Sequence, residues 1–210
     1  MSTIQLVLEF LGTFAFAISG IRLAASKNFD WFGGYVVGLA TAIGGGTIRD
    51  VMLGVTPFWM TNSIYLIFTA AALVLVIIFK KALVGFYHTW FIFDTLGLAL
   101  FTIAGVQKAL LAGFPFWVAI IMGCMTGAAG GVIRDVLINE VPLIFRKEIY
   151  AVACIIGGLV YWLCYYLRAN METTVTLSFL AVVIIRLLAV KYHISLPHLR
   201  DVEDNEENLK

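Results

Sequence analysis

Charge is what this sequence lacks most. Asp, Glu, Lys and Arg make up 13% of its 210 residues, whereas a soluble domain carries about 25%. Hydrophobic residues make up 61%, and the mean hydropathy is +0.97. The formal net charge of +1 leaves no basic surface for nucleic acid. This composition excludes an ordinary soluble domain and a nucleic-acid partner, and it predicts an all-α polytopic membrane protein.

The sequence is also poor in the residues that build disulfides, metal sites and active sites. Its three cysteines, Cys124, Cys154 and Cys164, all stand inside apolar runs without C-x-x-C spacing. No Walker loop, H-E-x-x-H motif or dinucleotide fingerprint occurs, and no nucleophile has a plausible base. We therefore expect no catalysis, no metal and no cofactor.

Long apolar runs take the place of the missing charge. A helix needs roughly 20 apolar residues to cross a bilayer, and seven segments qualify. The predicted membrane helices are at about 4–25, 31–53, 62–79, 90–111, 115–138, 148–167 and 173–190. The first is interpreted as a retained helix rather than a signal peptide, because it lacks a basic flank and a cleavage site. Residues 1–198 are expected to form one transmembrane domain, and 199–210 a disordered acidic tail.

Basic residues predict the orientation, because Lys and Arg concentrate on the cytoplasmic side of a membrane. With the N-terminus outside, most basic residues fall on the inner side. They include the loop pairs at 80–81 and 146–147, and Arg186 in the last predicted helix. The sequence therefore predicts a multi-pass protein of the cell inner membrane, with its N-terminus outside and its C-terminus in the cytoplasm.

The sequence repeats itself at a constant spacing of 85 residues, without gaps. The shift superposes Gly12 and Gly97, Phe16 and Phe101, Gly45-Gly46 and Gly130-Gly131, Arg49-Asp50 and Arg134-Asp135, and Pro57 and Pro142. Each unit, about 4–84 and 89–169, holds three membrane helices. Because three is odd, the two copies must enter the membrane in opposite directions, with the helix at 173–190 left over. Inverted repeats are typical of transporters and related pores, whose sites lie near the midplane between the halves.

Glycines are concentrated near the end of the second predicted helix and at the matching place in the fifth. They are Gly44, Gly45, Gly46, Gly130 and Gly131. Small residues at four-residue spacing allow helices to approach closely, but three consecutive glycines cover almost every face of a helix. They predict a break or sharp kink beside a path through the protein. Thr41 and Thr126, one turn earlier, are expected to line that path, although such hydroxyls often bond to the carbonyl four residues before.

Six charged residues are predicted to lie inside the membrane at matching depths. They are Glu9, Arg49 and Asp50 in the first repeat, and Asp94, Arg134 and Asp135 in the second. Because an unpaired charge in the bilayer is costly, we expect Glu9 to meet Arg49 and Asp94 to meet Arg134. Two interpretations stay open: interhelical staples, or a wet path in which the spare carboxylates of Asp50 and Asp135 attract cations. Lys108, in contrast, is expected to snorkel to the surface.

At Gly-Gly-Gly-Thr-Ile-Arg-Asp and Gly-Gly-Val-Ile-Arg-Asp, each followed by a proline, the sequence resembles a known family. It looks like the bacterial UPF0126 membrane proteins, related to the trimeric intracellular cation (TRIC) channels, over residues 4–190. The resemblance implies a homotrimer in membrane lipid, each protomer with its own pore between kinked second and fifth helices. It also implies conduction of monovalent cations, chiefly potassium.

Two functions remain open from the sequence. The first is a passive cation channel, indicated by the doubled carboxylates, the paired glycine runs and the resemblance. The second is a carrier for glycine or another small amino acid, because some members of the bacterial grouping are described as glycine transporters. Broken helices in inverted repeats also commonly bind a substrate carboxylate at a helix N-terminus. A purely structural membrane protein would leave the repeated ionic motif with only a packing role.

Overall fold

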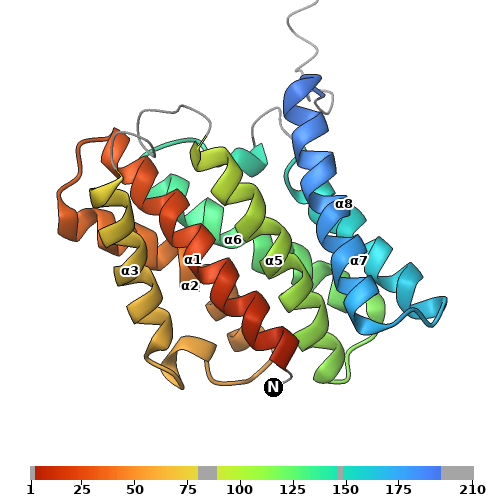
Figure 1. The fold of residues 1–210 in the computed structure, drawn as a ribbon. Helices are drawn as coiled ribbons and strands as arrows, with labels where there is room; N and C mark the ends of the chain where they lie inside the picture. The colour runs from red at the N-terminus through yellow and green to blue at the C-terminus, as the bar shows by residue number, and fades with distance from the viewer. Residues whose placement is uncertain (1–2, 80–88, 146–148, 195–210) are drawn as a thin grey trace, which may run out of the picture.

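The computed structural model describes residues 3–79, 89–145 and 149–194, and all regular structure in these ranges is helical (Figure 1). The α-helices are α1 (Thr3–Ser26), α2 (Trp31–Met52), α3 (Ile64–Ile78), α5 (Thr89–Leu111), α6 (Phe116–Leu137), α7 (Ala151–Tyr166) and α8 (Met171–Lys191). Two 3-10 turns, η1 (Phe58–Met60) and η2 (Leu143–Phe145), follow α2 and α6. The seven predicted helices are confirmed, with ends within three residues of those expected.

Five of the helices are long and apolar enough to cross a membrane by length and composition: α1, α2, α5, α6 and α8. The other two, α3 and α7, have 15 and 16 residues and are shorter than the segments predicted for them. The basic pairs at 80–81 and 146–147 and the acidic segment 199–210 lie outside the described residues. The protein is an all-α polytopic membrane protein.

Local sequence signals account for several helix ends. The side chain of Asp30 accepts a hydrogen bond from the Gly33 amide, which caps the free N-terminus of α2. Residues with positive φ terminate helices because they cannot continue a right-handed helix. These residues recur 85 positions apart: Asn28 (φ 60°) and Gly113 (φ 85°), and Gly54 (φ 70°) and Asn139 (φ 56°). The repeat therefore extends to the backbone conformation of the turns.

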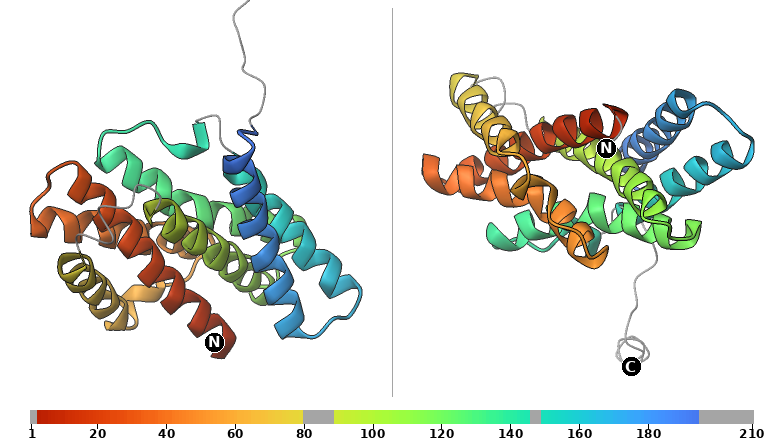
Figure 2. Two further views of the ribbon diagram at one scale, coloured as in Figure 1. Left: turned by 45° about the horizontal axis from the view of Figure 1, so that its top comes forward. Right: turned by 90° about the horizontal axis from the view of Figure 1, so that it is seen from below.

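Four helices form the centre of the bundle. α1 packs against α2 and α5, and α6 packs against α2 and α5. α3 covers α1 and α2 on one side, whereas α7 and α8 flank α5 and α6 on the other (Figures 1 and 2). In Figure 1, α1 runs upward from the N-terminus and α5 runs downward, as an inverted repeat requires.

The glycines place α2 and α6 in direct backbone contact. A Cβ atom on Gly45 would collide with the carbonyl oxygen of Thr126, and one on Gly130 would collide with the carbonyl oxygen of Thr41. Both helices are continuous through these positions. The predicted break at Gly44–Gly46 is therefore wrong: the glycines allow the helices to touch while every turn keeps its hydrogen bonds. A bend without a break stays a prediction.

Candidate functional site: two buried charge clusters

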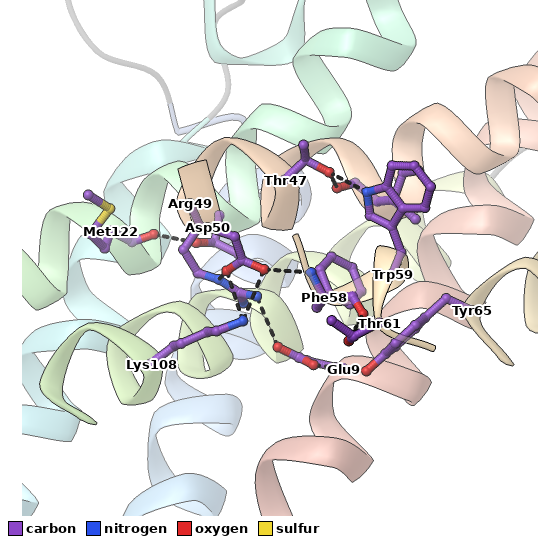
Figure 3. A network of polar contacts seen from close by, with 12 residues as sticks. Glu9, Thr47, Arg49, Asp50, Phe58, Trp59, Thr61, Tyr65, Lys108 and Met122 are labelled. Atoms are coloured by element: carbon purple, nitrogen blue, oxygen red, sulfur yellow. Dashed lines mark hydrogen bonds and ion pairs between the residues drawn. The ribbon is translucent and has the colours of Figure 1, made fainter. Parts of the chain in front are cut away.

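The first cluster joins Glu9 of α1, Arg49 and Asp50 of α2, and Lys108 of α5 (Figure 3). Arg49 Nη2 lies 3.0 Å from Glu9 Oε1, and Arg49 Nε lies 2.7 Å from Asp50 Oδ1. Lys108 Nζ lies 2.9 Å from Asp50 Oδ1. The side chains of the first three are fully buried, and that of Lys108 is 17% exposed. Two acids and two bases therefore balance each other where α1, α2 and α5 meet.

The carboxylates of the first cluster also organise the chain that follows α2. Asp50 Oδ2 accepts a hydrogen bond of 2.8 Å from the Phe58 amide at the start of η1. Tyr65 of α3 donates its hydroxyl to Glu9 Oε2 at 3.0 Å. These contacts tie η1 and α3 to the central helices (Figure 3). Each acid thus serves both as an ion-pair partner and as an anchor for the backbone or a neighbouring helix.

The second cluster contains Asp94 of α5, Arg134 and Asp135 of α6, and Arg186 of α8. Arg134 pairs with Asp94 through Nη1, and its Nε lies 2.8 Å from Asp135 Oδ1. Arg186 Nη2 lies 3.9 Å from Asp94 Oδ2. All four side chains are buried. Because Arg134 also donates to the hydroxyl of Ser19 at 2.8 Å, this cluster lies toward the end of α1 opposite to Glu9.

The bonds of the first cluster recur in the second with the 85-residue spacing. The Leu143 amide at the start of η2 donates to Asp135 Oδ2 at 3.0 Å, as Phe58 does to Asp50. Tyr150 donates to Asp94 Oδ1 at 3.4 Å, as Tyr65 does to Glu9. The predicted pairs Glu9–Arg49 and Asp94–Arg134 are both present.

The structure corrects the interpretation of Asp50 and Lys108. Asp50 is not a spare carboxylate, because Arg49, Lys108 and the Phe58 amide all contact it. Lys108 does not simply snorkel to the surface, because its ammonium group ends at Asp50. Asp135 is also engaged, by Arg134 and the Leu143 amide. Neither aspartate was expected to bind a loop amide, although the proline that follows each one marked a turn there.

Arg186 is the member of the second cluster for which the sequence analysis predicted no partner. Its guanidinium carbon lies 5.0 Å from the centre of the Phe91 ring and 4.8 Å from that of Tyr150. Its Nη1 donates to the Ile149 carbonyl at 3.4 Å. An arginine inside the last apolar run was a usable signal, since a charge there requires a partner. The repeat could not identify that partner because α8 lies outside both copies.

A cavity of about 300 Å³ opens beside the second cluster. Its walls are formed by Arg22, Leu23, Ser26, Lys27, Trp90, Asp135, Ile138, Glu140 and Leu143. Lys27 and Glu140 form an ion pair of 2.5 Å between partly exposed side chains. Leu23 corresponds to Lys108 under the 85-residue shift. Leu23 and Asp135 both line this cavity, so an apolar side chain occupies the position that, in the other repeat, carries the ammonium group that reaches Asp50.

The two threonines that were expected to line a path are fully buried. Thr41 donates its hydroxyl to the Val37 carbonyl, and Thr126 donates to the Met122 carbonyl, each at 2.6 Å. These are the local bonds that the sequence analysis named as the alternative. Their role in a path stays a prediction. Among the described residues, no three His, Cys, Asp or Glu side chains come together in a way that could hold a metal ion.

These features define a class: a polytopic helical membrane protein built from an inverted repeat, with a neutralised charge cluster in each half. The model of the family described as Glycine transporter matches the chain twice, at residues 6–81 and 91–166. The second match begins and ends 85 residues after the first. The chain therefore belongs to this family.

Two of these relatives illustrate the similarity. A UPF0126 membrane protein of Vibrio cholerae is 41% identical over 197 residues, which cover 91% of this chain and 81% of that protein. The UPF0126 inner membrane protein YadS of Escherichia coli is 41% identical over 194 residues, or 90% of this chain and 93% of that protein. The resemblance to UPF0126 proteins is confirmed.

Solved structures show the same fold. The TRIC trimeric intracellular cation channel orthologue from Rhodobacter sphaeroides has a TM-score of 0.86 at 31% identity, covering 92% of this chain and all of that chain. A second TRIC cation channel structure has a TM-score of 0.82 at 34% identity, covering 93% of this chain and 97% of that chain. The predicted resemblance to TRIC channels is confirmed over nearly the whole chain.

Proposed function

We propose that this protein is a monovalent cation channel of the bacterial inner membrane, with potassium as its main ion. Each protomer of a homotrimer carries its own path along α2 and α6. The observation that carries this proposal is the pair of charge clusters on these two antiparallel helices. Arg49 and Asp50 occupy the last turn of α2, and Arg134 and Asp135 the last turn of α6, so the clusters lie on either side of the glycine contact. The solved relatives described as trimeric cation channels support the same function and assembly.

The arrangement is that of a closed conformation. The backbone contacts at Gly45 and Gly130 leave no room between α2 and α6 for an ion. Conduction requires the two helices to separate or bend at these positions. Glycine favours such a change, because it has no side chain that would resist the new helix positions. Thr41 and Thr126, whose carbonyls meet the glycines, would then become accessible to the ion.

The described basic residues support an orientation with the N-terminus outside. Arg22 and Lys27 lie near the end of α1, and Arg186 and Lys191 near the end of α8. These ends lie on the side of the second cluster. Because basic residues favour the cytoplasmic side, the second cluster and its cavity face the cytoplasm.

Recordings from purified protein in planar bilayers test the proposal. We expect single-channel currents in potassium salt without any amino acid present. We also expect the variants Asp50→Asn and Asp135→Asn to alter the conductance, because each removes a negative charge beside the path. The matched control is Glu172→Gln, which removes an exposed carboxylate in the first turn of α8. If both aspartate variants keep the wild-type conductance and selectivity, these carboxylates do not contribute to the path.

A glycine carrier is the second candidate, and the name of the matching family favours it. The cavity beside the second cluster is larger than a small zwitterion and has both basic and acidic walls, with Arg22 and Lys27 near Asp135 and Glu140. Reconstituted liposomes distinguish the two functions. Saturable glycine uptake without ionic currents would establish the carrier and refute the channel.

A further inference from the structure

The two charge clusters differ in only one of their four members. The acids and the arginines of the α2 and α6 motifs correspond under the 85-residue shift, but the second base of each cluster does not. In the first cluster this base is Lys108 of α5, whose counterpart in the first repeat is Leu23. In the second cluster it is Arg186, contributed by the helix that belongs to neither repeat.

The two clusters have the same formal charge, although different helices supply their second bases. Each contains two acids and two bases, so the formal charge of each group of four is zero. Charges that are buried together need this balance, because removing one partner leaves an uncompensated ion in a medium of low polarity. Without its second base, either cluster would carry one net negative charge. In the first cluster Lys108 of α5 completes this charge balance. In the second cluster Arg186 of α8 completes it.

The two bases are held in different ways. Lys108 is partly exposed, and its flexible stem carries a single point charge to Asp50. Arg186 is fully buried, lies over the rings of Phe91 and Tyr150, and also donates to a backbone carbonyl. A planar guanidinium held on two ring faces has little freedom to leave its site. The positive charge near Asp94 is therefore enclosed by two rings and a backbone carbonyl, whereas the one at Asp50 lies at the end of a partly exposed side chain.

We propose that Arg186 is a positioning residue through which α8 sets the charge balance between the two ends of the cation path. Its guanidinium places a positive charge 3.9 Å from Asp94 Oδ2 and thereby limits how many cations collect at the second cluster. It thereby decides whether cations pass more easily in one direction than in the other. This inference rests on the proposed channel function, because it concerns the direction of conduction through the same path.

Current–voltage curves in symmetric potassium chloride test this inference. Arg186→Met leaves the second cluster with one net negative charge. Cations entering from that end should carry about twofold more current at low salt, and the difference should shrink at high salt. Lys108→Met is the matched variant and should change the curve in the opposite direction. Arg186→Lys keeps the charge and should retain the wild-type asymmetry, which a purely packing role of the guanidinium would not predict.

Two more variants keep the test decisive if Arg186→Met does not assemble. Asp94→Asn alone makes the second cluster positive and should reduce the current of cations entering there. Arg186→Met combined with Asp94→Asn is neutral, so its curve should return to that of the wild type. A double variant that behaves like Asp94→Asn alone would overturn the inference, because the charge of Arg186 would then have no effect.

The outcomes separate this inference from the function on which it rests. Wild-type currents with an unchanged curve in Arg186→Met would overturn the role of Arg186 and leave the channel intact. Changes in the same direction for Arg186→Met and Lys108→Met would also overturn it. A wild-type protein that passes no current would overturn the proposed function itself, and this inference with it.

Discussion

Replacing Gly45 with alanine should destabilise the protein through the contact between α2 and α6. The added Cβ would collide with the carbonyl oxygen of Thr126, and it would also lie 3.2 Å from the Gly130 amide nitrogen. All of these are backbone atoms, so no rotation of a side chain can make room. The two helices would have to move apart by about 1 Å to restore ordinary van der Waals distances.

The expected size follows from two opposing effects. Overpacking a well-packed interior costs about 1–3 kcal/mol, whereas alanine favours a helix over glycine by about 1 kcal/mol. Gly34→Ala in the same helix isolates the second effect, because its Cβ would lie 3.9 Å from the nearest atom, Cγ2 of Ile21. We expect Gly34→Ala to match or exceed the wild-type stability and Gly45→Ala to fall below it. The gap in the melting midpoint should be about 2–12 °C, because the overpacking cost separates the two variants and each kcal/mol shifts the midpoint of a chain of this size by about 2–4 °C.

Thermal unfolding of both variants in one detergent measures this gap. Gly130→Ala should behave like Gly45→Ala, because its Cβ would collide with the carbonyl oxygen of Thr41. Gly44→Ala should be milder, because its added atom meets only Cδ1 at the flexible end of Ile133, at 2.5 Å. A midpoint for Gly45→Ala at or above that of Gly34→Ala would refute the view that this glycine is required for backbone contact.

Two further predictions concern contacts around the clusters. Tyr65→Phe should lower the free energy of unfolding by about 1 kcal/mol more than Tyr150→Phe does. The reason is that the hydrogen bond from Tyr65 to Glu9 is 3.0 Å long, whereas the corresponding bond from Tyr150 to Asp94 is 3.4 Å long. Equal losses of the two variants in thermal unfolding would contradict this. Lys27→Ala should change the unfolding midpoint little, because its ion pair with Glu140 is partly exposed and such pairs contribute at most about 1 kcal/mol. A loss of stability as large as that expected for a buried ion pair would contradict this and would show that the contact maintains the shape of the cavity.

Much of the candidate site could be predicted because an unpaired charged side chain has a high free energy in lipid. A buried arginine needs an acid at its own depth, and the repeat specified which acid stands at that depth in each half. This reasoning found Glu9 for Arg49 and Asp94 for Arg134, both of which are in contact. The same reasoning did not find the bond between Asp50 and the Phe58 amide, because depth alone says nothing about where a loop turns back.

Two contacts depended on the lateral positions of the helices, which sequence spacing does not describe. Helical periodicity places a residue along a helix and around it, but not the neighbour that it will meet. Lys108 could reach either the surface or Asp50, and only the packing of α5 against α2 decided between them. Arg186 met Asp94 because α8 packs on α5, outside the symmetry of the repeat.

The glycines show the same limit most clearly. From the sequence alone, the three glycines at Gly44–Gly46 were compatible with a broken helix or with close packing, since both depend on the absence of a side chain. The composition, the seven helices, the inverted repeat and the pairing of buried charges followed from the high energy of leaving polar groups unsatisfied in lipid. The contact of Gly45 with Thr126 and the position of Arg186 beside Asp94 depend on how the helices lie beside one another. That arrangement is decided only when all the helices pack together, because many side chains must fit at once.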